Sequence, residues 1–358
     1  MFLWIIFYLL ELLILALAQI ATEIRSKKIL FAFSALLAIY FSSFRNSLGT
    51  DYKGYIEQMG FSDFDLNSEP IFNFIKFIIL ESNLSPIFFF TICAIVTVWL
   101  FWKYLDNGNN QFASLSIIIF LSLPGLYFNT FNIVRQYFSA AIFLYSLKYI
   151  KSKQLICYIL CITTACLMHI SSIILFPLYF VLNKRFSFKT YIIFTIGLII
   201  IAYSLEPIFN AITLFSDRFS LYLETEEESN KSTITFLCLI ILFVYFINRK
   251  THPLNNSYDD SPYMVMTTNM FILYTIFSVM TFVNFYFYRI TFYFGASLCI
   301  IMPNIIFKIL KNRVSTTIVC LLFSFAYFFS FIIKGKDDPT ICSDNILPIT
   351  SIFDISPI

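Results

Sequence analysis

Charged residues are scarce in this chain, and glycine and proline are scarcer still. Of its 358 residues only 13% are Asp, Glu, Lys or Arg, and 59% are hydrophobic. A typical soluble domain has about a quarter charged residues, so this composition excludes a water-soluble globule. The 8 glycines and 11 prolines also exclude collagen-like and low-complexity sequence.

Motifs for nucleotide, metal and disulfide sites are lacking too. The sequence has no Walker loop, no G-x-G-x-x-G, no H-E-x-x-H and no C-x-x-C, so we expect no cofactor and no metal. Asp63 and Asp65 form a D-x-D-like pair, which enzymes that use sugar nucleotides employ with a metal, but two loop acids are more simply solvated. Cysteines in apolar runs are expected to pack as small apolar residues. Seven of the eight lie in such runs: Cys93, Cys157, Cys161, Cys166, Cys238, Cys299 and Cys320.

Long apolar runs are what the chain has in abundance, and its mean hydropathy is +0.80. The runs are continuous, often near twenty residues, and lack the alternation of a membrane barrel. They predict an all-α, polytopic transmembrane helical bundle with about twelve spans. Residues 1–20 lack the basic segment and cleavage site of a signal peptide and predict the first span. The expected helices are 2–22, 28–44, 85–104, 112–128, 132–150, 153–168, 171–183, 189–206, 232–248, 263–283, 287–308 and 314–333.

We expect one transmembrane domain over residues 1–334 and a polar tail over 335–358. Long loops are expected at 45–84 and 206–231, the first containing a short interfacial or re-entrant helix over Glu69–Leu80. Alternate connections hold fifteen of the 24 basic residues and only four acids. Because Lys and Arg favour cytoplasmic loops, this predicts that both long loops and both termini face outward.

Four ionisable residues fall at outward ends of the predicted helices: Arg45, Arg135, His169 and Arg289. Each has an ordinary explanation by itself, such as snorkelling of an arginine to the interface or an ion pair of Arg135 with Glu11. Together they predict a cationic, outward-facing pocket. A guanidinium donates two parallel hydrogen bonds to a phosphate, so an anionic headgroup is the expected ligand.

These positions belong to an ordered set of short motifs. In chain order they are Arg45 with Gly49-Thr50-Asp51-Tyr52 and Tyr55, Ser68-Glu69-Pro70, Asn132 with Arg135-Gln136, His169-x-Ser171, and Tyr288-Arg289. Over residues 40–295 this set resembles the EpsG/Wzy type of O-antigen and exopolysaccharide polymerases. The resemblance implies a GT-C-like bundle in the bacterial inner membrane with its active site on the periplasmic face.

The resemblance also implies a glycosyltransferase that needs neither metal nor sugar nucleotide. Such polymerases move a growing glycan from undecaprenyl pyrophosphate to a lipid-linked repeat unit. The implied partners are the undecaprenyl-pyrophosphate-linked oligosaccharide, membrane lipid and a chain-length regulator, with no nucleic acid. An O-antigen ligase and a flippase of lipid-linked sugars are the alternatives. Clustering of the candidate residues at one face favours an enzyme over a transporter.

Roles for individual residues follow as hypotheses. The catalytic candidates are Arg135, His169 and Asp51, and the substrate-binding candidates are Arg45, Arg289, Gln136, Tyr52 and Glu69. The arginines would bind pyrophosphate and stabilise the leaving charge. The base that deprotonates the acceptor hydroxyl is His169, Asp51 or Glu69, and the sequence leaves these three open.

Overall fold

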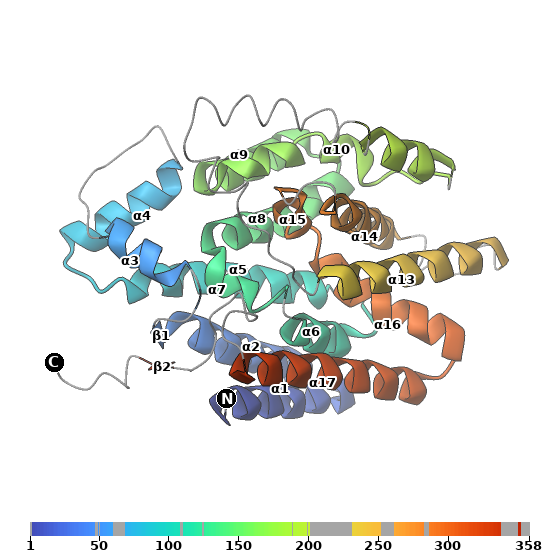
Figure 1. Cartoon of the computed structure of the whole chain (residues 1–358), viewed down its shortest axis with the longest axis horizontal. Coiled ribbons are helices and arrows are strands. Elements are labelled where there is room, and N and C mark those ends of the chain that lie inside the picture. Colours follow the sequence, from blue (N-terminus) through green and yellow to red (C-terminus); the bar gives the residue numbers. More distant parts are fainter. Residues whose placement is uncertain are drawn as a thin grey trace. The chain divides into compact units, whose positions relative to one another are not determined.

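The computed structural model describes residues 2–46, 49, 51–59, 69–107, 110–123, 125–187, 189–198, 200, 231–251, 261–282, 286–337 and 350–351. Apart from two short strands, the regular elements there are helices, which confirms the all-α prediction (Figure 1). The strands β1 (Arg45–Asn46) and β2 (Thr350–Ser351) pair antiparallel. The helices are α1 (Phe2–Ile20), α2 (Ile24–Ser43), α3 (Tyr52–Met59), α4 (Pro70–Glu81), α5 (Ile87–Leu105), α6 (Ala113–Ser122), α7 (Asn129–Asn132), α8 (Val134–Lys151), α9 (Leu155–Met168), the 3-10 helix η1 (Ile170–Leu175), α10 (Leu178–Val181), a helix over Lys189–Leu198, α13 (Lys231–Thr251), α14 (Pro262–Met280), α15 (Tyr286–Thr291), α16 (Ala296–Leu310) and α17 (Arg313–Asp337).

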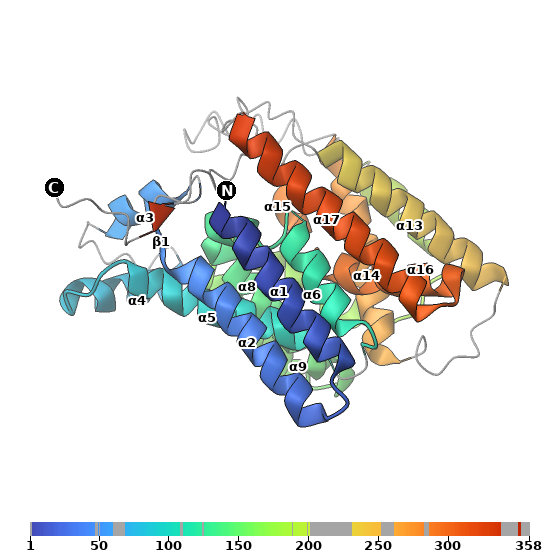
Figure 2. The same ribbon diagram turned by 90° about the horizontal axis from the view of Figure 1, so that it is seen from below.

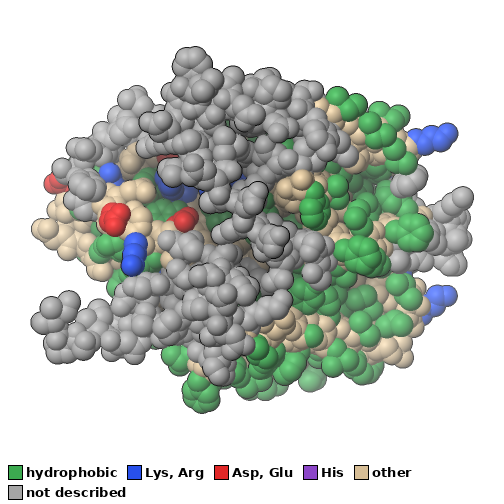
Figure 3. Space-filling view, in the orientation of Figure 1, with side chains coloured by type: hydrophobic (Ala, Val, Ile, Leu, Met, Phe, Trp, Pro, Cys, Tyr) green, Lys and Arg blue, Asp and Glu red, His purple; other side chains and the backbone are tan. Residues whose placement is uncertain are grey.

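The chain is an integral membrane protein. Among the described residues, α1, α5, α14 and the Arg313–Ile333 part of α17 are long and apolar enough to cross a membrane, and several shorter apolar helices accompany them. Hydrophobic side chains occupy much of the described surface, and charged ones are few (Figure 3). The total of about twelve spans stays a prediction.

Three predicted spans are broken in the structure. The span expected at 112–128 ends at Ser122, two residues before Pro124; the one at 171–183 is split into η1 and α10 before Pro177. The one at 287–308 is split into α15 and α16 by a turn at Gly295. Proline cannot continue the backbone hydrogen bonding, and glycine favours turns, so apolar composition alone overestimated helix length.

The chain divides into two compact units, residues 1–182 with 299–358, and residues 183–298. In the first unit α1 lies beside α2, as Figure 2 shows, α5 packs on α2 and α8, and α8 packs on α9. The single transmembrane domain over residues 1–334 stays a prediction. All candidate residues except Arg289 belong to the first unit.

A buried carboxyl group joins the first helices of this unit. Glu11 in α1 is fully buried and accepts a hydrogen bond from Ser34 Oγ in α2 at 2.6 Å. Trp102 in α5 donates its indole N–H to the same Ser34 oxygen at 2.9 Å. This polar cluster satisfies Oε2 of Glu11, whereas its Oε1 is buried without a hydrogen-bond partner among the described residues.

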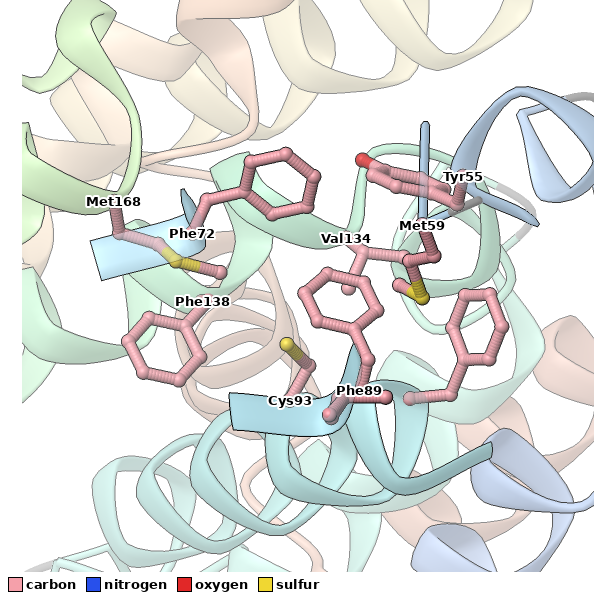
Figure 4. Close-up of a cluster of buried hydrophobic side chains, with 10 residues drawn as sticks. Tyr55, Met59, Phe72, Phe89, Cys93, Val134, Phe138 and Met168 are labelled. Carbon is pink, nitrogen blue, oxygen red and sulfur yellow. The ribbon is translucent and has the colours of Figure 1, made fainter. Parts of the chain in front are cut away.

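An apolar cluster supports several of the candidate residues of the same unit. The labelled side chains of this cluster, which come from five helices, point toward one another in Figure 4. Its buried members are Tyr55 and Met59 of α3, Phe72 and Ile79 of α4, Phe89, Phe90 and Cys93 of α5, Val134 and Phe138 of α8, and Met168 of α9. These helices also carry, or directly adjoin, the charged candidates. Close packing of the cluster therefore fixes the charged side chains with respect to one another.

Candidate functional site

Glu69 lies at the centre of the candidate site, immediately before Pro70 at the start of α4. Its backbone φ is +48°, in the left-handed region that a residue other than glycine rarely adopts. This conformation costs roughly 1–2 kcal/mol. Such strain is retained only where the surrounding structure determines it, and functional sites are a common place for it.

The side chain of Glu69 bonds to two of the predicted residues at once. Its Oε1 is 2.6 Å from His169 Nδ1, and its Oε2 accepts a hydrogen bond from Arg135 Nη1. Exposed fractions are 13% for Glu69, 16% for His169 and 27% for Arg135, so the cluster is partly shielded from water. In the sequence, Glu69 is 66 positions from Arg135 and 100 positions from His169, yet the three side chains form one network.

The network holds Glu69 in its ionised form. Burial by itself would raise the pKa of this carboxyl group, but the hydrogen bond from His169, the charge of Arg135 and the Ile170 backbone N–H together lower it below its usual value. A carboxylate is therefore present between the two basic side chains at neutral pH.

Glu69 is expected to stabilise the fold only while it is ionised. Because its folded-state pKa lies below the usual 4.5, its contribution is complete above that pH and is lost as pH falls through the lower native value. At neutral pH, Glu69→Gln should cost about 1–3 kcal/mol, since hydrogen bonds to a charged group are weakened. Thermal unfolding in detergent across a pH series checks this. A gap between wild type and variant that persisted in strong acid would contradict it.

Arg135 lies over two aromatic rings as well as beside Glu69. Its guanidinium carbon is 4.7 Å from the centre of the Phe72 ring and 5.5 Å from that of Tyr55. The negative charge of Asp51, an exposed residue, also acts on Arg135. The ion pair with Glu11 considered from the sequence is wrong, because Glu11 bonds to Ser34 and Arg135 to Glu69.

Arg45 lies in a different environment, although it shares neighbours with Arg135. It is 1% exposed, and its guanidinium carbon lies 4.3 Å from the centre of the Phe90 ring and 5.0 Å from that of Phe131. Burial lowers the pKa of Arg45 to about 10, which still leaves it charged at neutral pH. Both guanidiniums interact electrostatically with Tyr55 and Cys93, so they flank the same small region.

Gly49 fixes the loop that carries Arg45. Its φ is +98°, and a Cβ atom there would lie 2.6 Å from Asn132 Oδ1 and 2.9 Å from the Phe131 carbonyl oxygen. Gly49→Ala is therefore expected to destabilise the protein by more than about 1 kcal/mol, through both backbone strain and the clash with α7. Thermal unfolding in detergent measures it.

Gly54→Ala is the matched control, because a Cβ at Gly54 in α3 meets no atom within 4 Å. Alanine is the better helix former, so this variant should unfold at the same temperature as wild type or higher. Equal destabilisation by the two substitutions would show that the contact of Gly49 with α7 is unimportant.

The remaining predicted residues are distributed as follows. Tyr52 is half-buried and stacks on Phe90 with ring centres 5.2 Å apart. Gln136 is fully buried in α8, and Arg289 is half-buried in α15 of the other unit. Within the described ranges no three His, Cys, Asp or Glu side chains gather as metal ligands, and Asp63 and Asp65 lie outside those ranges.

Sequence reasoning identified Glu69 but missed its position between Arg135 and His169. It also missed the aromatic surroundings of the arginines, Phe72 and Tyr55 for one and Phe90 and Phe131 for the other. The sequence signal for Glu69 was its place in the Ser68-Glu69-Pro70 motif, and its left-handed backbone does not follow from Pro70, which favours an extended conformation at the preceding residue.

Comparison with known proteins gives one family. The model of the EpsG family matches residues 28–351, a range that contains every candidate residue. We found no match among curated proteins or among solved structures.

Proposed function

Because the chain belongs to the EpsG family, and so is a membrane protein of exopolysaccharide or O-antigen biosynthesis, we propose that it is the polymerase itself. It transfers the growing glycan from undecaprenyl pyrophosphate to a lipid-linked repeat unit at the periplasmic face of the inner membrane. The observation that supports this best is the Glu69 carboxylate, which orients His169 and holds Arg135 beside it. A base next to a guanidinium suits transfer of a sugar from a phosphate leaving group.

His169 is the base in this proposal. A carboxylate only accepts hydrogen bonds, so the proton of the neutral imidazole lies on Nδ1, which faces Glu69. The lone pair is then on Nε2, which takes the proton from the acceptor hydroxyl. Glu69 is thereby a positioning residue, and Asp51 contributes negative charge near Arg135.

Arg135 stabilises the negative charge that develops on the leaving pyrophosphate. The acceptor oxygen forms the new bond to the anomeric carbon of the donor glycan as the bond from that carbon to pyrophosphate breaks. The electron pair of the broken bond goes to undecaprenyl pyrophosphate, and the acceptor proton goes to His169. A guanidinium has five N–H donors, so Arg135 can bond to Glu69 and a phosphate oxygen together. The role of Arg289, which lies in the other unit, as a phosphate ligand stays a prediction.

A surface-polysaccharide gel of a strain that lacks the gene tests the proposal, with and without the intact gene supplied in trans. The expected result is a single repeat unit on the lipid acceptor, restored to a ladder of lengths by complementation. Accumulation of lipid-linked polymer that is not transferred would identify a ligase instead. Accumulation of single lipid-linked units with no surface glycan would identify a flippase. Either outcome would overturn the polymerase.

A further inference from the structure

A buried positive charge without a counter-ion among the described residues is the least expected feature of the first unit. Arg45 is 1% exposed, and its Nε and Nη1 atoms are buried without hydrogen-bond partners in the part of the chain that the structure describes. The ionisable groups that interact electrostatically with Arg45 are neutral at physiological pH. They are the phenols of Tyr55, Tyr52 and Tyr127 and the thiol of Cys93. In the described part of the chain, no carboxylate is paired with it.

Burial of Arg45 in this environment raises the free energy of the folded protein when no ligand is bound. A buried charge loses its hydration, and unsatisfied N–H groups lose hydrogen bonds that water would have supplied. The rings of Phe90 and Phe131 offset part of this through cation–π attraction. They leave the two nitrogen atoms without an acceptor among the described residues, so an added group that accepts hydrogen bonds would complete the environment of Arg45.

Arg135 offers the contrast within the same region. It shares the neighbours Tyr55 and Cys93 with Arg45, but its charge is already balanced by Glu69. At Arg135 an incoming anion would bind beside the Glu69 carboxylate, whose negative charge repels it, whereas no carboxylate of the described residues is paired with Arg45. An anionic ligand is therefore expected to bind at Arg45 before it binds at Arg135.

We infer that Arg45 is the primary anion-binding residue of this site and binds a phosphate group of the lipid-linked pyrophosphate substrate by donating hydrogen bonds from its Nε–H and Nη1–H groups. This rests on the proposed function and deepens it by separating two tasks. Arg45 anchors the phosphate, and Arg135 stays with Glu69 and His169 for the chemical step. A phosphate suits Arg45 because its several oxygens can reach donors on more than one edge of a guanidinium.

Binding to purified full-length protein in phosphate-free detergent buffer tests this, with thermal stabilisation by inorganic pyrophosphate and by undecaprenyl pyrophosphate as readouts. Arg45→Met should lower the affinity about 10–100-fold, the loss expected for hydrogen bonds to a charged group. Arg135→Met is the comparison and should lower it less. Because Arg45 is buried, association should also be slower than diffusion allows.

Equal affinity of wild type and Arg45→Met would overturn the inference. If Arg45→Met does not fold, Arg45→Lys decides: a lower affinity supports the anion site, since lysine lacks the guanidinium geometry, and an unchanged affinity overturns it. Stabilisation by phosphatidylglycerol vesicles with no further effect of undecaprenyl pyrophosphate would assign Arg45 to a bilayer headgroup and overturn the substrate assignment. The two proposals can fail separately. If pyrophosphate binds through Arg45 but deletion of the gene leaves polymer length unchanged, the polymerase proposal is refuted and the anion site at Arg45 stands.

Discussion

Replacing His169 by glutamine should reduce polymerisation by about 10²–10⁴-fold, the usual contribution of a positioned general base. Glutamine keeps a polar side chain of similar reach but cannot take a proton from the acceptor hydroxyl. The readout is the length distribution of lipid-linked glycan made by purified protein from isolated repeat units. On a gel the ladder should collapse to the single unit while the amount of protein in the membrane stays the same.

The matched control is His252→Gln, because His252 is the second of the two histidines in the chain. It lies in a predicted cytoplasmic loop, outside the described residues, and should leave the ladder unchanged. Glu69→Gln adds a finer test of the positioning role. It should lower kcat with little change in KM, since it affects the basicity of His169 more than binding. A ladder that survives His169→Gln would return the role of base to Asp51 or to Glu69.

The second large effect is expected at Arg135. Arg135→Met should lower the rate by about 10²–10³-fold, as removal of one preorganised donor at a leaving charge does elsewhere. Lysine should restore little of this activity, because an ammonium group cannot reproduce the planar fork of donors. Arg25→Met, an exposed change at the start of α2, is the control and should behave as wild type.

Arg135→Met also leaves the Glu69 carboxylate without its partner, which by itself destabilises the protein. The double variant Arg135→Met with Glu69→Gln separates the two effects. It should recover thermal stability relative to Arg135→Met and remain inactive. Recovery of activity together with stability would mean that Arg135 serves the fold and takes no part in the reaction.

The sequence supports some conclusions about this protein better than others. Helix content and membrane insertion follow from apolar composition, which acts over twenty residues at a time and tolerates single exceptions such as Glu11. The family follows from short motifs in a fixed order, and the match over residues 28–351 confirms it. The breaks at Ser122, Leu175 and Thr291 depend on single prolines and glycines, which an average over an apolar run does not weigh.

Partners within the site could not be predicted from the sequence. Each arginine had several acids within plausible reach, and only the packing of α3, α4, α5, α8 and α9 decides which is chosen. Glu69 was one of three candidate bases, and its contacts with both His169 and Arg135 are the reason that we propose a positioning role for it. Arg45 showed the opposite difficulty, because a sequence cannot reveal that two of its guanidinium nitrogens have no hydrogen-bond partner among the described residues.

The two-residue pairing of β1 with β2 constrains how the polypeptide is threaded through the bilayer. Arg45 lies opposite Ser351 and Asn46 opposite Thr350, and backbone hydrogen bonds of this kind cannot reach across a membrane. The two segments must therefore share a compartment, and the chain between them makes an even number of crossings. A reporter fused after the last residue would consequently read out the compartment of Arg45 without any alteration of the first loop.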